Sequence, residues 1–282
     1  MCPKFFFSLF IFGLLFLYSC KPKPAIAPLF ELKENSGINF YNNIKNSRDF
    51  NVLTYRNFYN GGGVAIGDIN SDGLADVFFT ANMGPNKLYL NKGNLKFEDI
   101  SEKAGFINKG KWATGVVMAD INHDGLLDIY VCYAGYQKGI DQQNELYINN
   151  GISSSPSGEG RGDFSSSPLV ERAGVRFTES AELYGLNDNG YTTHASFFDY
   201  DLDGDLDCFM INNSFIPVNT LNYANTRDLP SEEWPVADFL KGGGNRLLKN
   251  ENGKYIDVTN ETGIHSSLIS FGLGVTVGDV NG

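Results

Sequence analysis

The segment Asp68-Ile-Asn-Ser-Asp-Gly-Leu-Ala-Asp76 decides the fold, because it recurs along the chain. A second copy runs from Asp120 to Asp128, a third from Asp199 to Asp207, and a fourth starts at Asp279 and is cut off at Gly282. We call residues 68–76, 120–128 and 199–207 loops 1, 2 and 3. Self-similarity of this kind is typical of repeat architectures, and the incomplete fourth copy leads us to expect a longer parent protein.

Each loop lies between two short segments with strand character. In the first unit, Gly63-Val-Ala-Ile-Gly67 precedes the loop and Val77-Phe-Phe-Thr80 follows it. Two further blocks then follow, Asn86-Lys-Leu-Tyr-Leu-Asn91 and Phe97-Glu-Asp-Ile-Ser101, and both recur in the next two units. Four strand candidates per unit predict the four-stranded antiparallel blade of a β-propeller. The predicted fold is all-β, a partial β-propeller with about three blades and the start of a fourth.

The composition agrees with this fold class. The 32 glycines, 22 phenylalanines and 14 tyrosines favour tight turns between aromatic-rich strands. A formal net charge of −11 argues against nucleic acid as a partner, because a polyanion would repel the chain.

The loops place oxygen donors at positions 1, 3, 5 and 9, with glycine at position 6, where it permits a sharp turn. Calcium takes about six to eight oxygen ligands and tolerates irregular geometry, so Ca²⁺ is the predicted cofactor. We expect it to stabilise the blades, because clustered carboxylates repel one another without a metal. The predicted side-chain donors are Asp68, Asn70, Asp72 and Asp76 in loop 1, Asp120, Asn122, Asp124 and Asp128 in loop 2, Asp199, Asp201, Asp203 and Asp207 in loop 3, and Asp279 and Asn281 in the incomplete fourth loop. The predicted carbonyl donors are those of Leu74, Leu126 and Asp205, and we expect the Asp205 carboxylate to face solvent.

Other interpretations of the loops exist. Plain Asp/Asn/Gly turns between strands would explain the composition without a metal. An EF-hand loop would run into a helix, whereas strand-like sequence follows Asp76 and Asp128. Magnesium is less suitable, because it demands near-octahedral geometry and keeps its waters.

The N-terminus predicts export. An apolar stretch runs from Phe5 to Tyr18. Leu17-Tyr18-Ser19-Cys20, which overlaps the end of this stretch, resembles a bacterial lipobox. We therefore expect a lipoprotein signal peptide at residues 1–19, lipidation of Cys20, a tether at 20–28 and the propeller at 29–282. An ordinary cleaved signal or an uncleaved anchor is the alternative. The predicted location is the cell envelope, as an outer-membrane lipoprotein.

Two cysteines remain in the predicted mature domain, Cys132 and Cys208, and both lie in apolar strand segments. We expect buried free thiols rather than a bridge, because their strands belong to different repeats.

Two insertions separate the units, at residues 152–176 and 213–244. The first is rich in Ser and Gly and contains Arg161-Gly162-Asp163, which we interpret as a chance tripeptide. The second contains Trp234 and other aromatic residues and is the better candidate for a recognition surface.

The sequence contains no recognisable catalytic arrangement. It lacks a Gly-x-Ser-x-Gly elbow and a phosphate-binding glycine loop, and its three histidines, His123, His194 and His265, form no zinc or nucleophile motif. We predict that the chain is not an enzyme.

The units resemble FG-GAP or VCBS repeats of the integrin α-subunit propeller type. Phe271-Gly272 stands where the family has Phe-Gly, and Trp112 and Tyr191 occupy the aromatic position, although the Gly-Ala-Pro part is absent. The segments Tyr59–Gly63 and Tyr191–His194 are similar to the bacterial ASPIC/UnbV, cartilage-acidic-protein-like group. The resemblance implies a seven-bladed ring in the full protein and a role in adhesion or ligand binding.

Two functional classes follow. The first is an exported, lipid-anchored, calcium-binding propeller that acts as a binding, adhesion or scaffold module towards a glycan or an envelope or extracellular protein. The alternative is the non-catalytic propeller part of a larger secreted polysaccharide-degrading enzyme.

Overall fold

The computed structural model describes residues 28–106, 110–135, 140–152, 175–213, 229–236, 241 and 243–279. The predicted signal peptide, Cys20, most of both insertions with the Arg161-Gly162-Asp163 tripeptide, and Asn281 lie outside the described residues. The chain divides into two units, Met1–Glu34 and Asn35–Gly282. The described part of the first unit is strongly exposed, including Leu29, Phe30 and Leu32.

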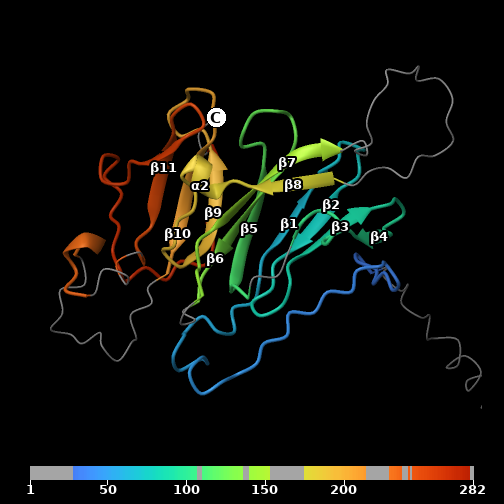
Figure 1. Cartoon of the computed structure of the whole chain (residues 1–282), viewed down its shortest axis with the longest axis horizontal. Helices are drawn as coiled ribbons and strands as arrows, with labels where there is room; N and C mark the ends of the chain where they lie inside the picture. The colour runs from blue at the N-terminus through green and yellow to red at the C-terminus, as the bar shows by residue number, and fades with distance from the viewer. Residues whose placement is uncertain are drawn as a thin grey trace, which may run out of the picture. The chain divides into compact units, whose positions relative to one another are not determined.

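The second unit contains three four-stranded antiparallel sheets, in each of which neighbouring strands are consecutive in the chain (Figure 1). This confirms the predicted all-β fold and its four-stranded units. The first sheet contains β1 (Val64–Gly67), β2 (Asp76–Phe79), β3 (Lys87–Asn91) and β4 (Phe97–Asp99). The second contains β5 (Ala113–Ala119), β6 (Asp128–Tyr133), β7 (Glu145–Ile152) and β8 (Val175–Glu179). The third contains β9 (Thr192–Phe198), β10 (Asp207–Asn212), β11 (Arg246–Asn250) and β12 (Tyr255–Asp257). Helical structure within the described residues is short: α2 (Ala181–Tyr184), the 3-10 turn η2 (Ser231–Glu233), and 3-10 backbone at Lys241 and Gly243.

Strand β6 shows why these sheets pack face to face. All six of its residues are buried. Successive side chains of a strand point to opposite faces, so both faces of β6 must be covered by neighbouring sheets. Ile129, Val131 and Tyr133 join the core cluster shared with the first sheet. Tyr130 and Cys132 join the cluster shared with the third sheet. The second sheet is therefore covered by apolar contacts on both faces.

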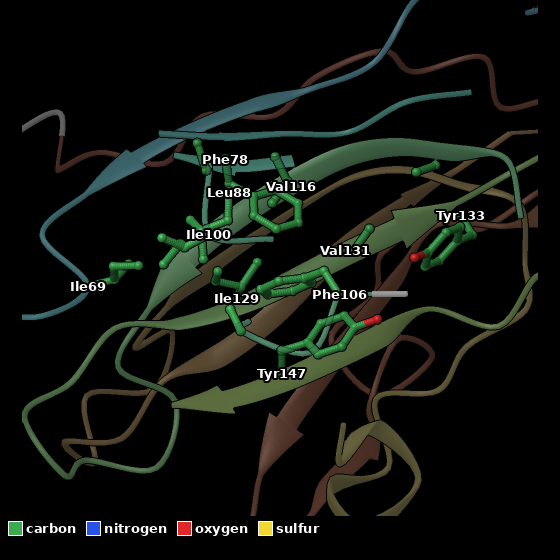
Figure 2. Close-up of a cluster of buried hydrophobic side chains, with 13 residues drawn as sticks. Ile69, Phe78, Leu88, Ile100, Phe106, Val116, Ile129, Val131, Tyr133 and Tyr147 are labelled. Carbon is green, nitrogen blue, oxygen red and sulfur yellow. The ribbon is translucent and has the colours of Figure 1, made fainter. Parts of the chain in front are cut away.

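Figure 2 shows the cluster between the first and second sheets. Phe78 of β2 and Leu88 of β3 gather with Val116 of β5 and Ile129 of β6. Phe106, which follows β4, closes the cluster, with its ring centroid 4.9 Å from that of Phe78 and 4.7 Å from that of Tyr147. Burial of these large apolar side chains is the main favourable contribution to folding here.

The first strands of successive sheets approach closely because glycines lie between them. A Cβ atom on Gly63 would lie 2.8 Å from the Thr114 carbonyl oxygen, and one on Gly115 would lie 2.5 Å from the Thr193 carbonyl oxygen. Any side chain at these positions would force β1, β5 and β9 apart.

Threonine hydroxyls link the same strands. Thr114 Oγ1 donates to the Thr192 carbonyl oxygen at 2.7 Å, and Thr193 Oγ1 donates to the Gly272 carbonyl oxygen at 2.8 Å. Thr80 Oγ1 donates in the same way to the Thr114 carbonyl oxygen. Each unit is therefore hydrogen-bonded to the next, and the incomplete fourth repeat continues the pattern.

An aromatic cluster lies next to these strands. Trp112 and Tyr191, the two aromatic residues at the equivalent repeat position, are both buried in it with Phe50, Tyr55 and Phe58. The ring centroid of Phe50 lies 5.0 Å from that of Trp112 in an edge-on arrangement, which is favourable for aromatic pairs. Residues that precede the first repeat therefore complete the core of the repeats.

Two further sequence predictions concern membrane spans and thiols. In the part of the chain that the structure describes, no helix has the length and apolar character needed to cross a membrane. Cys132 and Cys208 are buried and free, as predicted. Burial raises the pKa of both thiols, so these cysteines act as small apolar core residues.

Phe78→Ala should destabilise the protein by about 3–5 kcal/mol, because it removes a fully buried ring and leaves a cavity between two sheets. Chemical denaturation followed by tryptophan fluorescence measures the change. Leu53→Ala is the control, since Leu53 is 91% exposed and its truncation should change the stability by less than about 0.5 kcal/mol. Equal effects of the two substitutions would contradict the assigned core.

Candidate metal loops

The three loops share one hydrogen-bonding pattern around the first aspartate. In loop 1, the Asp68 carboxylate accepts the backbone N–H groups of Asp72 at 3.1 Å and Gly73 at 2.7 Å. Loops 2 and 3 repeat both bonds at Asp120 and Asp199, with distances of 2.9–3.2 Å. The first aspartate therefore holds the turn closed and keeps its oxygens on the inner side of the loop.

The aspartate at position 9 is fully buried in each loop. Asp76 accepts the backbone N–H of Ile69 at 3.0 Å on one oxygen and that of Asn91 at 2.7 Å on the other. Asp128 and Asp207 accept the equivalent pairs of N–H groups, and all three aspartates have 0% exposure. One carboxylate thus ties the start of its loop to the third strand of its sheet.

The turn itself uses left-handed backbone. Position 4 has positive φ in every loop, at Ser71 (57°), His123 (60°) and Leu202 (63°), and the glycine at position 6 has φ of 83–99°. Such values are uncommon for residues other than glycine and persist where the surroundings enforce them. Since three different side chains adopt the same conformation, the loop geometry is set by the flanking aspartates.

The electrostatics of the loops favour a bound cation. Burial raises the pKa of the ninth aspartate in each loop, Asp76, Asp128 and Asp207, and the acidic neighbours in the loop add to the shift. The pKa of Asp128 is raised to about 6. Buried carboxylates that repel one another are stabilised in their charged form by a cation.

Loop 3 brings three carboxylates together most clearly. One oxygen from each of Asp199, Asp201 and Asp207 lies within 4.8 Å of the others. The prediction that the Asp205 carboxylate faces solvent is wrong in part: the residue is half-buried, and its Oδ1 atom is buried without a hydrogen-bond partner. The three clustered oxygens of Asp199, Asp201 and Asp207 fit a hard cation, because Ca²⁺ is bound through oxygen atoms alone.

The residue at position 3, and its contact with the aspartate at position 5, differ between the loops. Asn70 Nδ2 donates to Asp72 Oδ2 at 3.0 Å, and Asn122 Nδ2 donates to Asp124 Oδ2 at 2.9 Å. Loop 3 has Asp201 in place of the asparagine, and the Lys249 ammonium group lies 2.6 Å from Asp201 Oδ2 and 3.5 Å from Asp203 Oδ2. Among the described residues, a cluster of three carboxylates forms only in loop 3, whereas in loops 1 and 2 hydrogen bonds link the residues at positions 1, 3 and 5.

The hydrogen bonds described above involve the predicted side-chain ligands and do not test the predicted carbonyl ligands or the incomplete fourth loop. The carbonyl groups of Leu74, Leu126 and Asp205 stay predictions as ligands. Asp279 is exposed on the described part of the fourth repeat, and its partner Asn281 lies outside the described residues.

Sequence reasoning missed a contact between neighbouring units. Asn149, the last residue of the shared third-strand block, donates from Nδ2 to the Leu127 carbonyl oxygen at 3.1 Å and to the Ile69 carbonyl oxygen of loop 1 at 2.8 Å. The equivalent Asn91 and Asn250 donate to the carbonyl oxygens of Ala75 and Leu206 in their own loops. The recurrence of asparagine at this position was the available signal.

The histidines do not assemble a site in the described structure. His123 and His265 are exposed, and His194 is half-buried in β9, where burial lowers its pKa.

Comparisons with known proteins agree with this geometry. Residues 68–131, which contain loops 1 and 2, match the family described as FG-GAP-like repeat. Cartilage acidic protein 1 of Xenopus tropicalis is 40% identical over 74 residues, which are 26% of this chain and 11% of that protein. The proteins of the same name from Mus musculus (41% over 69 residues) and Homo sapiens (40% over 72 residues) match 24% and 25% of this chain and 11% of their own length. The match therefore spans only 11% of the length of these curated relatives, and it confirms the predicted resemblance to the FG-GAP and cartilage-acidic-protein-like group.

Asn149→Ala should cost about 1–3 kcal/mol, because it leaves two carbonyl groups of adjacent loops without their donor. Thermal or chemical denaturation in the absence of calcium measures the loss. Asn150→Ala is the matched control, since this neighbouring asparagine is exposed and makes only surface hydrogen bonds. A loss for Asn149→Ala no larger than that of the control would show that the contact between units is not stabilising.

Proposed function

Since this chain carries FG-GAP-like repeats, we propose that it is an exported, lipid-anchored, calcium-binding propeller that acts as a binding, adhesion or scaffold module at the cell envelope. The single observation that supports calcium most directly is the set of equivalent acidic loops. Each combines a first aspartate that closes the turn with a fully buried ninth aspartate whose pKa is raised by burial and by the acidic neighbours in the loop.

Calcium would be held by the side chains at positions 1, 3, 5 and 9 of each loop. Its charge would offset the mutual repulsion of the carboxylates, and the ion would thereby stabilise the connection between the first and second strands of every unit. The role is structural, because these groups are part of the turn and its attachment to the sheet.

Export and anchoring rest on the N-terminal sequence. The apolar stretch from Phe5 to Tyr18 and the lipobox-like Leu17-Tyr18-Ser19-Cys20 support a lipid anchor on Cys20. A chain held at the envelope in this way would present its propeller to ligands without a spanning helix.

The second insertion supports a binding role. Its described residues Ser231, Glu232 and Lys241 line a cavity of about 310 Å³ together with Arg246 and Asp257 of the third sheet. The cavity is rich in hydroxyl, amide and charged groups, so a polar ligand such as a glycan or a peptide of an envelope or extracellular protein suits it. The alternative is a non-catalytic propeller within a larger secreted polysaccharide-degrading enzyme. In that case the full-length protein should release reducing ends from a polysaccharide. A binding module should instead capture a glycan or a protein without turnover.

Calcium should raise the melting temperature of the purified mature chain by several degrees relative to chelator, because each site occupied at a hundred times its Kd adds about 2.7 kcal/mol to stability. Differential scanning calorimetry measures this, with magnesium as the ion control. Asp120→Asn should reduce the calcium stoichiometry by one in titration calorimetry, while Asp141→Asn, which removes an exposed carboxylate outside the loops, should leave it unchanged. A melting temperature that is the same in chelator and in millimolar calcium would refute the metal role.

Cys20→Ser should abolish lipidation. Metabolic labelling with an alkynyl fatty acid in an expressing bacterium should label the wild-type protein, and the variant should carry no label. Equal labelling of the two proteins would place the lipid elsewhere or rule it out.

A further inference from the structure

Loop 3 carries more negative charge than the other two loops. Positions 1, 3, 5, 7 and 9 are all aspartate in loop 3, whereas loops 1 and 2 have aspartate only at positions 1, 5 and 9. The two additional carboxylates are Asp201 and Asp205. Without a compensating group, this loop would be the most strongly repelled of the three.

The compensating group is a lysine from the third strand of the same sheet. Lys249 of β11 lies 2.6 Å from Asp201 Oδ2, 3.5 Å from Asp203 Oδ2 and 3.2 Å from Glu251 Oε1. The equivalent residues of the other sheets are Leu90 and Ile148, which pack against the apolar core clusters. The lysine therefore occurs in the one described unit that also has aspartate at loop position 3.

The two changes complement each other chemically. In loops 1 and 2, the asparagine amide at position 3 donates to the aspartate at position 5 and so holds the two side chains together. Aspartate at position 3 has no proton to donate, and the ammonium group of Lys249 takes over by bridging Asp201 and Asp203. An ammonium group at this point offsets part of the charge that a metal would otherwise offset.

We propose that Lys249 is a built-in counter-ion of loop 3, which keeps this loop formed without metal and makes its calcium affinity lower than that of loops 1 and 2. This inference rests on the proposed calcium role of the loops. Calcium entering loop 3 must recruit carboxylates that already bind the ammonium group, and it is repelled by that group's charge. In loops 1 and 2 the position-5 carboxylate accepts a neutral amide instead, and no ammonium group repels the entering ion.

The test uses the mature chain and measures calcium binding at loop 3 alone. Terbium luminescence is suited to this, because Tyr200 occupies position 2 of loop 3 and the Tyr255 hydroxyl donates to the Leu206 carbonyl oxygen at 2.6 Å, so both rings can sensitise an ion there. The part of the signal lost in Asp199→Asn identifies the contribution of loop 3. Competition with calcium then gives the affinity of this loop, and titration calorimetry gives the affinities of all sites together.

Lys249→Met should tighten calcium binding at loop 3 by about tenfold, because it removes a competing positive charge next to the ion. In chelator the same variant should melt at a lower temperature than wild type, since Asp201, Asp203 and Glu251 lose their common partner. Lys87→Met is the matched control: Lys87 lies on β3, has 26% side-chain exposure against 23% for Lys249, and lies 2.7 Å from Asp99 away from any loop. It should not change the affinity of loop 3.

A second variant covers the case in which Lys249→Met does not fold. Asp201→Asn combined with Lys249→Met gives loop 3 the asparagine and the apolar strand residue that loops 1 and 2 have, so its affinity should approach theirs. Unchanged or weaker calcium binding at loop 3 in both variants would overturn the inference while leaving the calcium role intact. Absence of calcium binding by the wild-type chain at any loop would overturn the calcium role, and this inference with it.

Discussion

The fold depends on a buried carboxylate at the junction of loop and sheet. Asp76, Asp128 and Asp207 each accept one N–H from the second residue of their loop and one from the asparagine that recurs on the third strand. These bonds fix where the second strand starts relative to the third. A fully buried charge is costly unless it is hydrogen-bonded and compensated. The carboxylate at position 9 therefore both fixes the sheet geometry and favours a cation in the loop.

The coupling extends from one unit to the next. The asparagine that donates its backbone N–H to Asp128 also donates its side-chain amide to the Ile69 carbonyl oxygen of the preceding unit. On the first strands, Thr114 and Thr193 hydroxyl groups donate to the following unit. Because polar links and the apolar clusters around β6 join the same sheets, stability is shared between nearest neighbours, as expected for a repeat protein.

Much of this architecture was predictable, and the reason is local. The loop spacing, the strand alternation and the position of Trp112 and Tyr191 all depend on residues within one unit, so repetition exposes them. The contact of Lys249 with Asp201 occurs in one unit, so no period marks it, and the recurring asparagine does not by itself reveal that Asn149 reaches Ile69 of the preceding unit. The partial burial of Asp205 was missed for the same reason: its environment is formed by neighbours that a linear pattern does not identify. The N-terminal signal and most of both insertions, which carry the predictions about location and recognition, lie outside the described residues.

Differences between the repeats are more informative about function than their similarities. Loops 1 and 2 use an asparagine amide to hold two ligand side chains together, and loop 3 achieves the same contact with an ammonium group from a strand. If the loops bind calcium as proposed, a loop that contains its own cation holds its shape when calcium is scarce, whereas a loop that contains an amide depends on the metal. Loop 3 is also the loop that precedes the second insertion, whose described residues line the polar cavity with Arg246 and Asp257. With the counter-ion role proposed for Lys249, the unit that supports the candidate recognition surface is the one whose loop would depend least on the metal.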